Sequence, residues 1–243
     1  MPDTPDPPVA HRAYDRLAAG YDREGDTKPA NAYLERPATL SLLPNVEGTY
    51  VLDAGCGAGH LTKALSDRGA TVVGLDVSHE MLTYARERIP DADFVQADLG
   101  SDLPLIDDGF DGITSSLAFH YIKDWESLLR ELRRILRPGG WVVFSVQHPH
   151  ADFEEYGDAR NYHEIERVSA NWDSFGEEVE VPAYRRPLSA MLGPALEAGF
   201  QLDRLLEPTP TEEYRQADPE RYEYEATRPN FLCLRLVTLT QTG

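Results

Sequence analysis

The stretch "VLDAGCGAGH", residues 51–60, decides the fold that we expect for this chain. It begins with an apolar run that ends in the carboxylate of Asp53, and glycines follow at Gly55, Gly57 and Gly59. Glycine lets the backbone adopt positive φ and approach a ligand closely, and a helix N-terminus beyond such a turn attracts an anionic group. The stretch therefore predicts a strand that turns into a helix beside a bound nucleotide.

Strands and helices alternate on both sides of this turn. The expected strands cover residues 49–55, 71–77, 92–99, 110–121, 141–149, 201–208 and 230–239, and the expected helices cover 59–69, 78–89, 124–137 and 187–198. This alternation predicts an α/β fold with a doubly wound, mostly parallel sheet.

Four segments make up what we expect to be a single domain over residues 1–243. They are an N-terminal helical lid of two helices (1–44), the nucleotide-binding core (45–148), an inserted cap segment (149–186) and a C-terminal helix with strands (187–243). The cap segment breaks the strand–helix rhythm, and its part 163–184 can form a hairpin. A charged, Tyr-rich loop is expected between the two late strands.

The charge of the chain is strongly negative. Its 243 residues include 42 acidic and 23 basic side chains, for a net charge of -19, and only three of the basic residues are lysines. Such a charge repels the phosphate backbone of nucleic acids, so no nucleic-acid partner is expected. An acidic, lysine-poor composition resembles the cytoplasmic proteins of salt-accumulating halophiles, and the alternative is an acidic protein from a host that does not accumulate salt.

The location that we expect is the cytoplasm. Two cysteines, Cys56 and Cys233, cannot form a disulfide framework, which fits a reducing compartment. The apolar runs are far shorter than the roughly 20 residues of a membrane span. The N-terminal residues 1–10 lack the basic and apolar regions of a secretory signal.

Three acidic residues indicate where the nucleotide lies. Asp53, Asp76 and Asp98 each fall at the end of a successive expected strand, and such ends meet at one edge of a parallel sheet. Asp76 can accept both ribose hydroxyls, and Asp98 can accept a hydrogen bond from an adenine amino group. A dinucleotide-binding G-x-G-x-x-G motif would place its third glycine at His60, which disfavours an NAD-dependent oxidoreductase.

Residues 51–143 resemble the core of the class I S-adenosylmethionine (AdoMet)-dependent methyltransferases. The similarity is greatest to the small-molecule group with a methyltransferase type 11 domain, which includes the quinone and biotin-pathway methyltransferases. It rests on "VLDAGCGAGHLTKAL", "VVGLDVSHEML", "FVQADLGSDLPLIDDGFDGITSSLAFHYIKD" and "ELRRILRPGGWVVFS". The resemblance implies a seven-stranded Rossmann-like sheet with an antiparallel last strand. It also implies that tyrosines of "YDRLAAGYD", residues 14–22, close over the cofactor.

The resemblance also implies a set of cofactor-binding residues for AdoMet and its product S-adenosylhomocysteine. Asp53 would face the ammonium group, Asp76 the ribose, and Asp98 with Leu99 the edge of the adenine. The remaining members are Tyr14 and Tyr21 near the methionyl end, Gly55, Cys56, Gly57 and Gly59 in the loop, Val77 and Met81 on the adenine, and Ser115. Cys56 is interpreted as a small filler of the loop and not as a nucleophile.

Methyl transfer by in-line displacement needs an aligned acceptor in a dry pocket, and a base only where the acceptor must lose a proton. His120, His148 and Tyr14 are the candidate catalytic residues. His120 follows the fourth strand and acts either as a base titrating near pH 6.5 or as a wall of the pocket. His148 and His150 share a face of an extended segment, but nothing supplies a clear third ligand, so no metal is expected.

The expected acceptor is a small molecule. Methyltransferases that act on amino groups of adenine or glutamine carry a proline-containing stretch after the fourth strand, where this chain has "SSLA" at 115–118. The cap segment acts either as a substrate cap or as a hairpin on the sheet edge; its aromatic residues are Phe153, Tyr156, Tyr162, Trp172, Phe175 and Tyr184. Arg185 or Arg186 would meet an acidic substrate, or both face solvent. A catalytically silent AdoMet-binding sensor or partner subunit remains the alternative function, and no signal indicates an oligomeric state.

Overall fold

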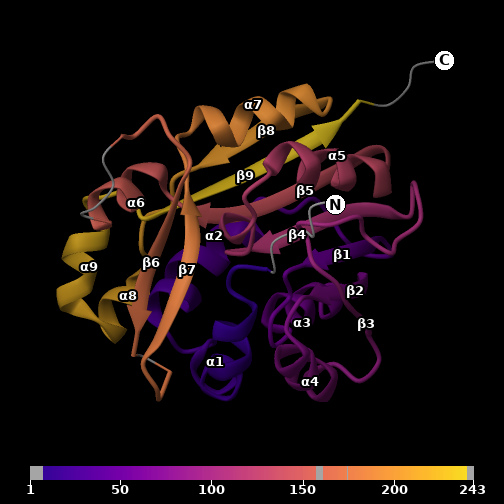
Figure 1. Ribbon diagram of the computed structural model, residues 1–243. Coiled ribbons are helices and arrows are strands. Elements are labelled where there is room, and N and C mark those ends of the chain that lie inside the picture. Colours follow the sequence, from indigo (N-terminus) through magenta and orange to yellow (C-terminus); the bar gives the residue numbers. More distant parts are fainter. Residues whose placement is uncertain (1–7, 157–160, 174, 240–243) are drawn as a thin grey trace, which may run out of the picture.

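The computed structural model describes residues 8–156, 161–173 and 175–239. In that part of the chain, seven strands form one sheet in the order β3-β2-β1-β4-β5-β9-β8 (Figure 1). The strands are β1 (Tyr50–Ala54), β2 (Thr71–Asp76), β3 (Asp93–Gln96), β4 (Phe110–Ser116), β5 (Leu136–Gln147), β8 (Phe200–Leu206) and β9 (Phe231–Thr238). Strands β1 to β5 pair in parallel, whereas β9 runs antiparallel to both β5 and β8. The doubly wound, mostly parallel sheet with an antiparallel last strand is confirmed, and β9 lies inside the sheet.

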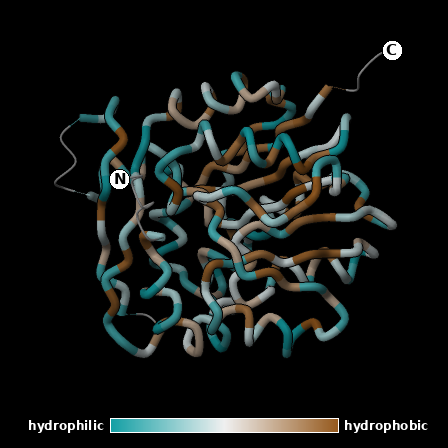
Figure 2. Tube along the Cα trace, turned by 45° about the vertical axis from the view of Figure 1, so that its right-hand side comes forward, coloured by the Kyte–Doolittle hydropathy of each residue, from teal (hydrophilic) through white to brown (hydrophobic). Residues whose placement is uncertain are grey.

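Helices cover both faces of this sheet because its strands are apolar on both faces. Leu52 and Val73 belong to a core with α5 (Trp125–Ile135) and α7 (Ser189–Glu197), whereas their neighbours Val51 and Val72 face α2 (Arg36–Ser41) and α3 (His60–Ser66). Successive strand residues point to opposite faces, so this alternation places one helical layer on each side. Figure 2 shows the central strands as hydrophobic tube enclosed by more polar helices.

The N-terminal helices and the cap segment lie together at one side of the sheet. Helix α1 (His11–Glu24) contacts α4 (His79–Arg88) and the strand at Val179–Arg185, and a π-helical turn, η1 (Asn31–Glu35), leads into α2. The expected hairpin is present as β6 (Glu166–Trp172) and β7 (Val179–Arg185), after α6 (Pro149–Glu155). Val179 and Val181 of β7 pack against Ala13 and Leu17 of α1, which positions the hairpin beside the lid (Figure 1).

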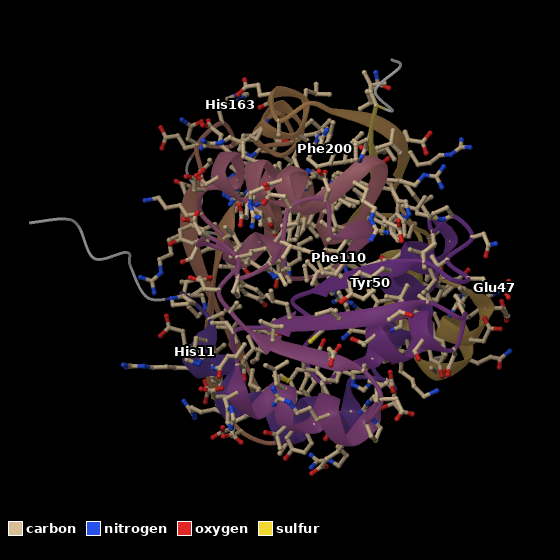
Figure 3. All side chains as sticks on the ribbon, turned by 90° about the vertical axis from the view of Figure 1, so that its right-hand side faces the viewer. His11, Glu47, Tyr50, Phe110, His163 and Phe200 are labelled. Carbon is tan, nitrogen blue, oxygen red and sulfur yellow. The ribbon has the colours of Figure 1, made fainter. Side chains whose placement is uncertain are left out.

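The two ends of the parallel strands differ. At the amino end, the rings of Tyr50 in β1 and Phe110 in β4 are stacked, with their centroids 4.9 Å apart (Figure 3). The carboxyl end opens on the glycine loop. Within the described residues no helix is long and apolar enough to cross a bilayer.

Three expectations about element boundaries are wrong. The fourth strand ends at Ser116 and not at Tyr121, because Leu117 adopts a positive φ of 51° and a 3-10 turn, η2 (Phe119–Tyr121), follows. Helix α5 ends at Ile135, and β5 begins directly at Leu136, ahead of Pro138. The expected loop between β8 and β9 contains α8 (Glu212–Ala217) and α9 (Pro219–Glu225), whose N-caps are Thr211 and Asp218.

The net charge of -19 predicts a response to salt. Self-repulsion opposes the compact state and is screened as ionic strength rises. Screening also weakens exposed ion pairs, but each of these contributes only about 0.2–1 kcal/mol. We therefore expect the melting temperature, followed by circular dichroism, to rise between low and molar KCl. A flat or falling melting temperature would contradict the interpretation of the charge as a halophilic adaptation.

Candidate active site

The three acidic strand ends converge on one cavity of about 270 Å³ at the carboxyl edge of the sheet. Asp53 lies in β1, Asp76 ends β2, and Asp98 follows β3 by two residues. Ten of the predicted cofactor-binding residues line this cavity: Tyr14, Tyr21, Asp53, Gly55, Cys56, Gly57, Asp76, Val77, Asp98 and Leu99. We call it the acidic cavity. Its position is the one that parallel α/β sheets use for ligands.

The three glycines of the loop have positive φ angles of 79°, 52° and 82°, and their surroundings are of two kinds. A Cβ on Gly55 would meet the Ala118 side chain at 2.3 Å, and one on Gly59 would meet the Ile89 side chain at 2.8 Å. Gly57 differs, since the nearest atom to its Cβ position is a ring carbon of Tyr21 at 4.0 Å. Gly55 and Gly59 thus permit close packing, and Gly57 leaves room in the cavity.

Asp76 joins the glycine loop to the second strand. Its two carboxylate oxygens accept backbone N–H groups, from Gly57 at 2.8 Å and from Ser78 at 2.9 Å. Burial raises the pKa of Asp76, while these hydrogen bonds oppose the rise. Each oxygen keeps further acceptor capacity, so the carboxylate can hold the loop and also accept hydroxyl groups of a ligand.

Asp53 is more deeply buried than Asp76 and is held by side-chain hydroxyls. It is 1% exposed, and its oxygens accept the hydroxyls of Thr62 at 2.6 Å and Thr114 at 3.3 Å. Burial raises its pKa to about 6 against the effect of these hydrogen bonds. A cationic group of a ligand would favour the ionised form of this carboxyl.

The outer rim of the cavity has different surroundings. Asp98 accepts the backbone N–H of Gly100 at 2.9 Å in a turn, beside the buried Leu99.

Cys56 in the glycine loop is buried, and burial raises the pKa of its thiol. That environment gives a neutral thiol, in keeping with a filler of the loop.

Three predicted cofactor-binding residues do not line the acidic cavity. Gly59 begins α3 and packs against α4. Met81 is fully buried with Ala18 and Ala58, and the Ser115 hydroxyl donates to the Ala54 carbonyl at 2.7 Å. These three residues stabilise the elements that surround the acidic cavity, Gly59 and Met81 by packing and Ser115 by its hydrogen bond.

A second cavity of about 200 Å³ adjoins the first, and we call it the aromatic chamber. Its rings come from α1 (Tyr14, Tyr21), from η2 (Tyr121) and from the hairpin side (Trp172, Phe175), and its other lining residues are Lys28, Asn31, Leu117, His120 and Gln147. Tyr14, Tyr21, Leu117 and Tyr121 line both cavities. The hydroxyls of Tyr14 and Tyr121 are hydrogen-bonded 2.7 Å apart, so this pair stands at the boundary.

His120 lines the aromatic chamber and not the acidic cavity. It is 5% exposed, and its Nδ1 atom has no hydrogen-bond partner. Burial, together with the charge of Arg186, lowers its pKa to about 3. The imidazole is therefore neutral near pH 7, where it can give or accept a hydrogen bond but is a weak base.

A prediction follows for the pH dependence of methyl transfer. Because the pKa of His120 lies at about 3, its titration adds no limb to the rate profile between pH 5 and 9. His120→Ala should raise the acceptor KM while the shape of the kcat–pH profile is retained. A limb near pH 6.5 that disappears in the variant would contradict a neutral His120. The comparison needs initial rates over a pH series for both proteins.

His148 lies outside the residues that line either cavity. It is the N-cap of α6, where its Nδ1 accepts the His150 backbone N–H at 3.2 Å, and its Nε2 lies 2.9 Å from Glu207. These contacts explain His148 as a structural residue. Within the described residues, no group of three His, Cys, Asp or Glu side chains is arranged to hold a metal.

Arg185 and Arg186 are buried, so of the two alternatives for them, contact with an acidic substrate or exposure to solvent, the second is wrong. Arg185 pairs with Glu166 and donates to the Asn161 carbonyl at 2.8 Å. Arg186 donates to the Ile122 carbonyl and lies 4.5 Å above the Trp125 ring. The Arg185 guanidinium thus ties the end of β7 to the start of the hairpin, whereas that of Arg186 joins the hairpin to the core. Neither arginine lines the two cavities.

Glu35 and Leu117 form a part of the site that the sequence does not indicate. Glu35 is 1% exposed, and its Oε1 accepts hydroxyls from Thr39 at 2.8 Å, from Ser116 at 2.9 Å and from Ser145. The backbone N–H of Leu117 donates to the Ser145 hydroxyl at 3.1 Å. A φ of 51° is strained for leucine, and this network holds Leu117 at the wall that both cavities share.

Comparisons with known proteins agree with this geometry. A family model described as a methyltransferase domain matches residues 52–144. The chain is 39% identical over 135 residues to a malonyl-[acyl-carrier protein] O-methyltransferase of Pectobacterium atrosepticum, covering 56% of this chain and 51% of the relative. It is 37% identical over 134 residues to a demethylmenaquinone methyltransferase of Clavibacter sepedonicus, covering 54% of each chain. The match thus spans about half the length of these two relatives.

A solved structure is similar over almost its whole length. This is a crystal structure of an S-adenosylmethionine-dependent methyltransferase from Mesorhizobium loti, with 30% sequence identity and a TM-score of 0.68. The similarity covers 87% of this chain and 99% of that chain. Together with the sheet order and the glycine loop, it shows that the chain belongs to the class I AdoMet-dependent methyltransferases.

Proposed function

We propose that this protein transfers the methyl group of AdoMet to a small-molecule acceptor, with AdoMet in the acidic cavity and the acceptor in the aromatic chamber. The observation that supports this most is the shared wall of the two cavities, formed by Tyr14, Tyr21, Leu117 and Tyr121. Methyl transfer requires donor and acceptor to meet in line at such a boundary.

The residues of the acidic cavity fit the chemistry of AdoMet. The buried carboxylate of Asp53 suits an ammonium group, the half-buried carboxylate of Asp76 suits ribose hydroxyls, and Asp98 suits an amino group. The Cβ position of Gly57 opens toward the cavity, so a bound molecule can approach the backbone there. Bound AdoMet supplies a methyl group on a sulfonium, already activated for displacement.

The chain's own residues would bind, orient and exclude water. Asp76 would accept the ribose hydroxyls, and Asp53, fixed by Thr62 and Thr114, would face the ammonium group. Tyr14 and Tyr121 would close the boundary around the reacting groups. Excluding water from this boundary would favour displacement, because fixed protein groups then replace the solvent around the acceptor.

A small acceptor is supported by the relatives as well as by the geometry. The relatives are named for methylation of malonyl-[acyl-carrier protein] and demethylmenaquinone. The net charge of -19 opposes nucleic-acid binding. The chamber of about 200 Å³ sets the size of the group that can enter.

The test separates an enzyme from a silent AdoMet-binding protein. The protein is incubated with AdoMet and a panel of small metabolites, and formation of S-adenosylhomocysteine is measured by mass spectrometry. We expect turnover with at least one acceptor, abolished by Asp76→Ala. Tight AdoMet binding without turnover across the panel would favour the sensor or partner-subunit alternative.

A further inference from the structure

Aromatic rings make up half of the residues that line the aromatic chamber. Tyr14 meets Trp172 edge-on with centroids 6.2 Å apart, and Trp172 lies 6.0 Å from Phe175. Tyr21 lies 5.2 Å from Phe175 at a tilt of 36°. These rings pack on one another at the chamber wall, and the parts of them that line the chamber can make stacked or edge-on contacts with a planar molecule.

The charge of the chamber contrasts with that of the chain. Acidic residues outnumber basic ones 42 to 23 in the whole sequence, yet no carboxylate lines the chamber among the described residues. Lys28 is its charged lining residue, with Nζ 4.0 Å from the centroid of Phe175. Glu24 and Asp173 are the acidic neighbours of Lys28, but neither lines the chamber. This distribution favours a neutral or anionic ligand and disfavours a cationic one.

Among the described residues that line the chamber, neither the histidine nor the tyrosines are suited to remove a proton near neutral pH. Burial lowers the pKa of His120 to about 3 and raises that of Tyr21 to about 12. Burial likewise raises the pKa of Tyr14 and Tyr121 well above the usual value. An acceptor that needs deprotonation would find no base among these side chains, whereas one that arrives as an anion needs none.

We propose that the acceptor is a planar, conjugated oxyanion that is already ionised near neutral pH, such as an aromatic carboxylate, and that the protein methylates its oxygen without taking a proton from it. This inference rests on the proposed function. An oxygen lone pair forms the new O–CH3 bond while the C–S bond breaks, and its electron pair remains on sulfur. The sulfonium and the oxyanion are both neutralised, so charge balances with no proton transfer. Asn31, Gln147 and His120 supply N–H donors around the acceptor.

The experiment compares three probes of similar size on protein saturated with S-adenosylhomocysteine. They are 2-naphthoate, planar and anionic; 2-naphthamide, planar and neutral; and decalin-2-carboxylate, anionic and not planar. Titration calorimetry should give 2-naphthoate an affinity about tenfold or more above that of the amide, since hydrogen bonds to charged groups are stronger. Stacking should favour it severalfold over the decalin. Equal or tighter binding of either comparison probe would overturn the proposal.

Two variants locate the effect in the chamber. Lys28→Met should remove most of the preference for naphthoate over naphthamide, and Trp172→Leu should reduce the preference for naphthoate over decalin carboxylate. Lys63→Met is the matched control, because Lys63 pairs with Asp67 on the exposed side of α3. An unchanged preference in Lys28→Met would overturn the proposal.

Binding of S-adenosylhomocysteine to each variant keeps the two proposals separate. If it binds normally and the probes show no preference for the planar anion, the acceptor class is wrong and the proposed function stands. If it fails to bind even the unaltered protein, the proposed function itself fails.

Discussion

Replacement of Asp76 by alanine should weaken the binding of S-adenosylhomocysteine by about 100-fold or more. Two ribose hydroxyls donating to one carboxylate contribute roughly 1.5–3 kcal/mol each before non-additivity, and about 1.4 kcal/mol corresponds to a factor of ten. The substitution also leaves the N–H groups of Gly57 and Ser78 without their acceptor. The glycine loop should therefore lose part of its fixed geometry together with the ligand contact.

Titration calorimetry on the purified variant measures this effect. Asp67→Ala is the matched control, since Asp67 is an exposed acid that pairs with Lys63 away from the cavity. Circular dichroism should show that both variants remain folded. An affinity of Asp76→Ala within twofold of the unaltered protein would remove the end of β2 from the ligand site.

Replacement of Glu35 by alanine should lower the free energy of unfolding by about 3–5 kcal/mol. A buried donor that loses its acceptor costs about 1–3 kcal/mol, and three hydroxyls share the Oε1 atom of Glu35. Ser145 in turn accepts the N–H of Leu117, whose positive φ is costly to maintain. The wall shared by the two cavities should therefore loosen as well.

Urea unfolding of three variants tests this account. Glu35→Gln keeps an acceptor oxygen and should recover about half or more of the lost stability. Glu47→Ala removes an exposed glutamate at the molecular periphery and should change stability by less than about 0.5 kcal/mol (Figure 3). A loss below about 1 kcal/mol in Glu35→Ala would show that the hydroxyl network is dispensable.

The sheet and the acidic cavity could be predicted because their signals are local. Consecutive apolar residues such as Val51 and Leu52 indicate a strand that is buried on both faces. The end of each such strand then fixes where the carboxylate that follows it lies. Asp53, Asp76 and Asp98 therefore reach one cavity as a consequence of parallel pairing. The spacing of the three glycines likewise predicts the turn between β1 and α3, because it depends only on neighbouring residues.

The rest of the site depends on contacts that no local pattern records. Glu35 meets Ser116 and Ser145 across 81 and 110 residues of sequence. The pKa of His120 is set by burial and by Arg186, far along the chain, so its position after the fourth strand suggests a base that its surroundings do not support. Helices α8 and α9 could not be predicted for a different reason. They are short, so their sequences show little helical periodicity of apolar residues.

Binding of the product S-adenosylhomocysteine tests, without any acceptor, the proposal that the acidic cavity holds AdoMet beside an acceptor site. Calorimetric titration with S-adenosylhomocysteine should give a dissociation constant in the micromolar range, about -8 kcal/mol. NAD, titrated under the same conditions, should bind much more weakly, because His60 stands where a dinucleotide loop has its third glycine. NAD binding as tight as that of S-adenosylhomocysteine, or tighter, would contradict the account.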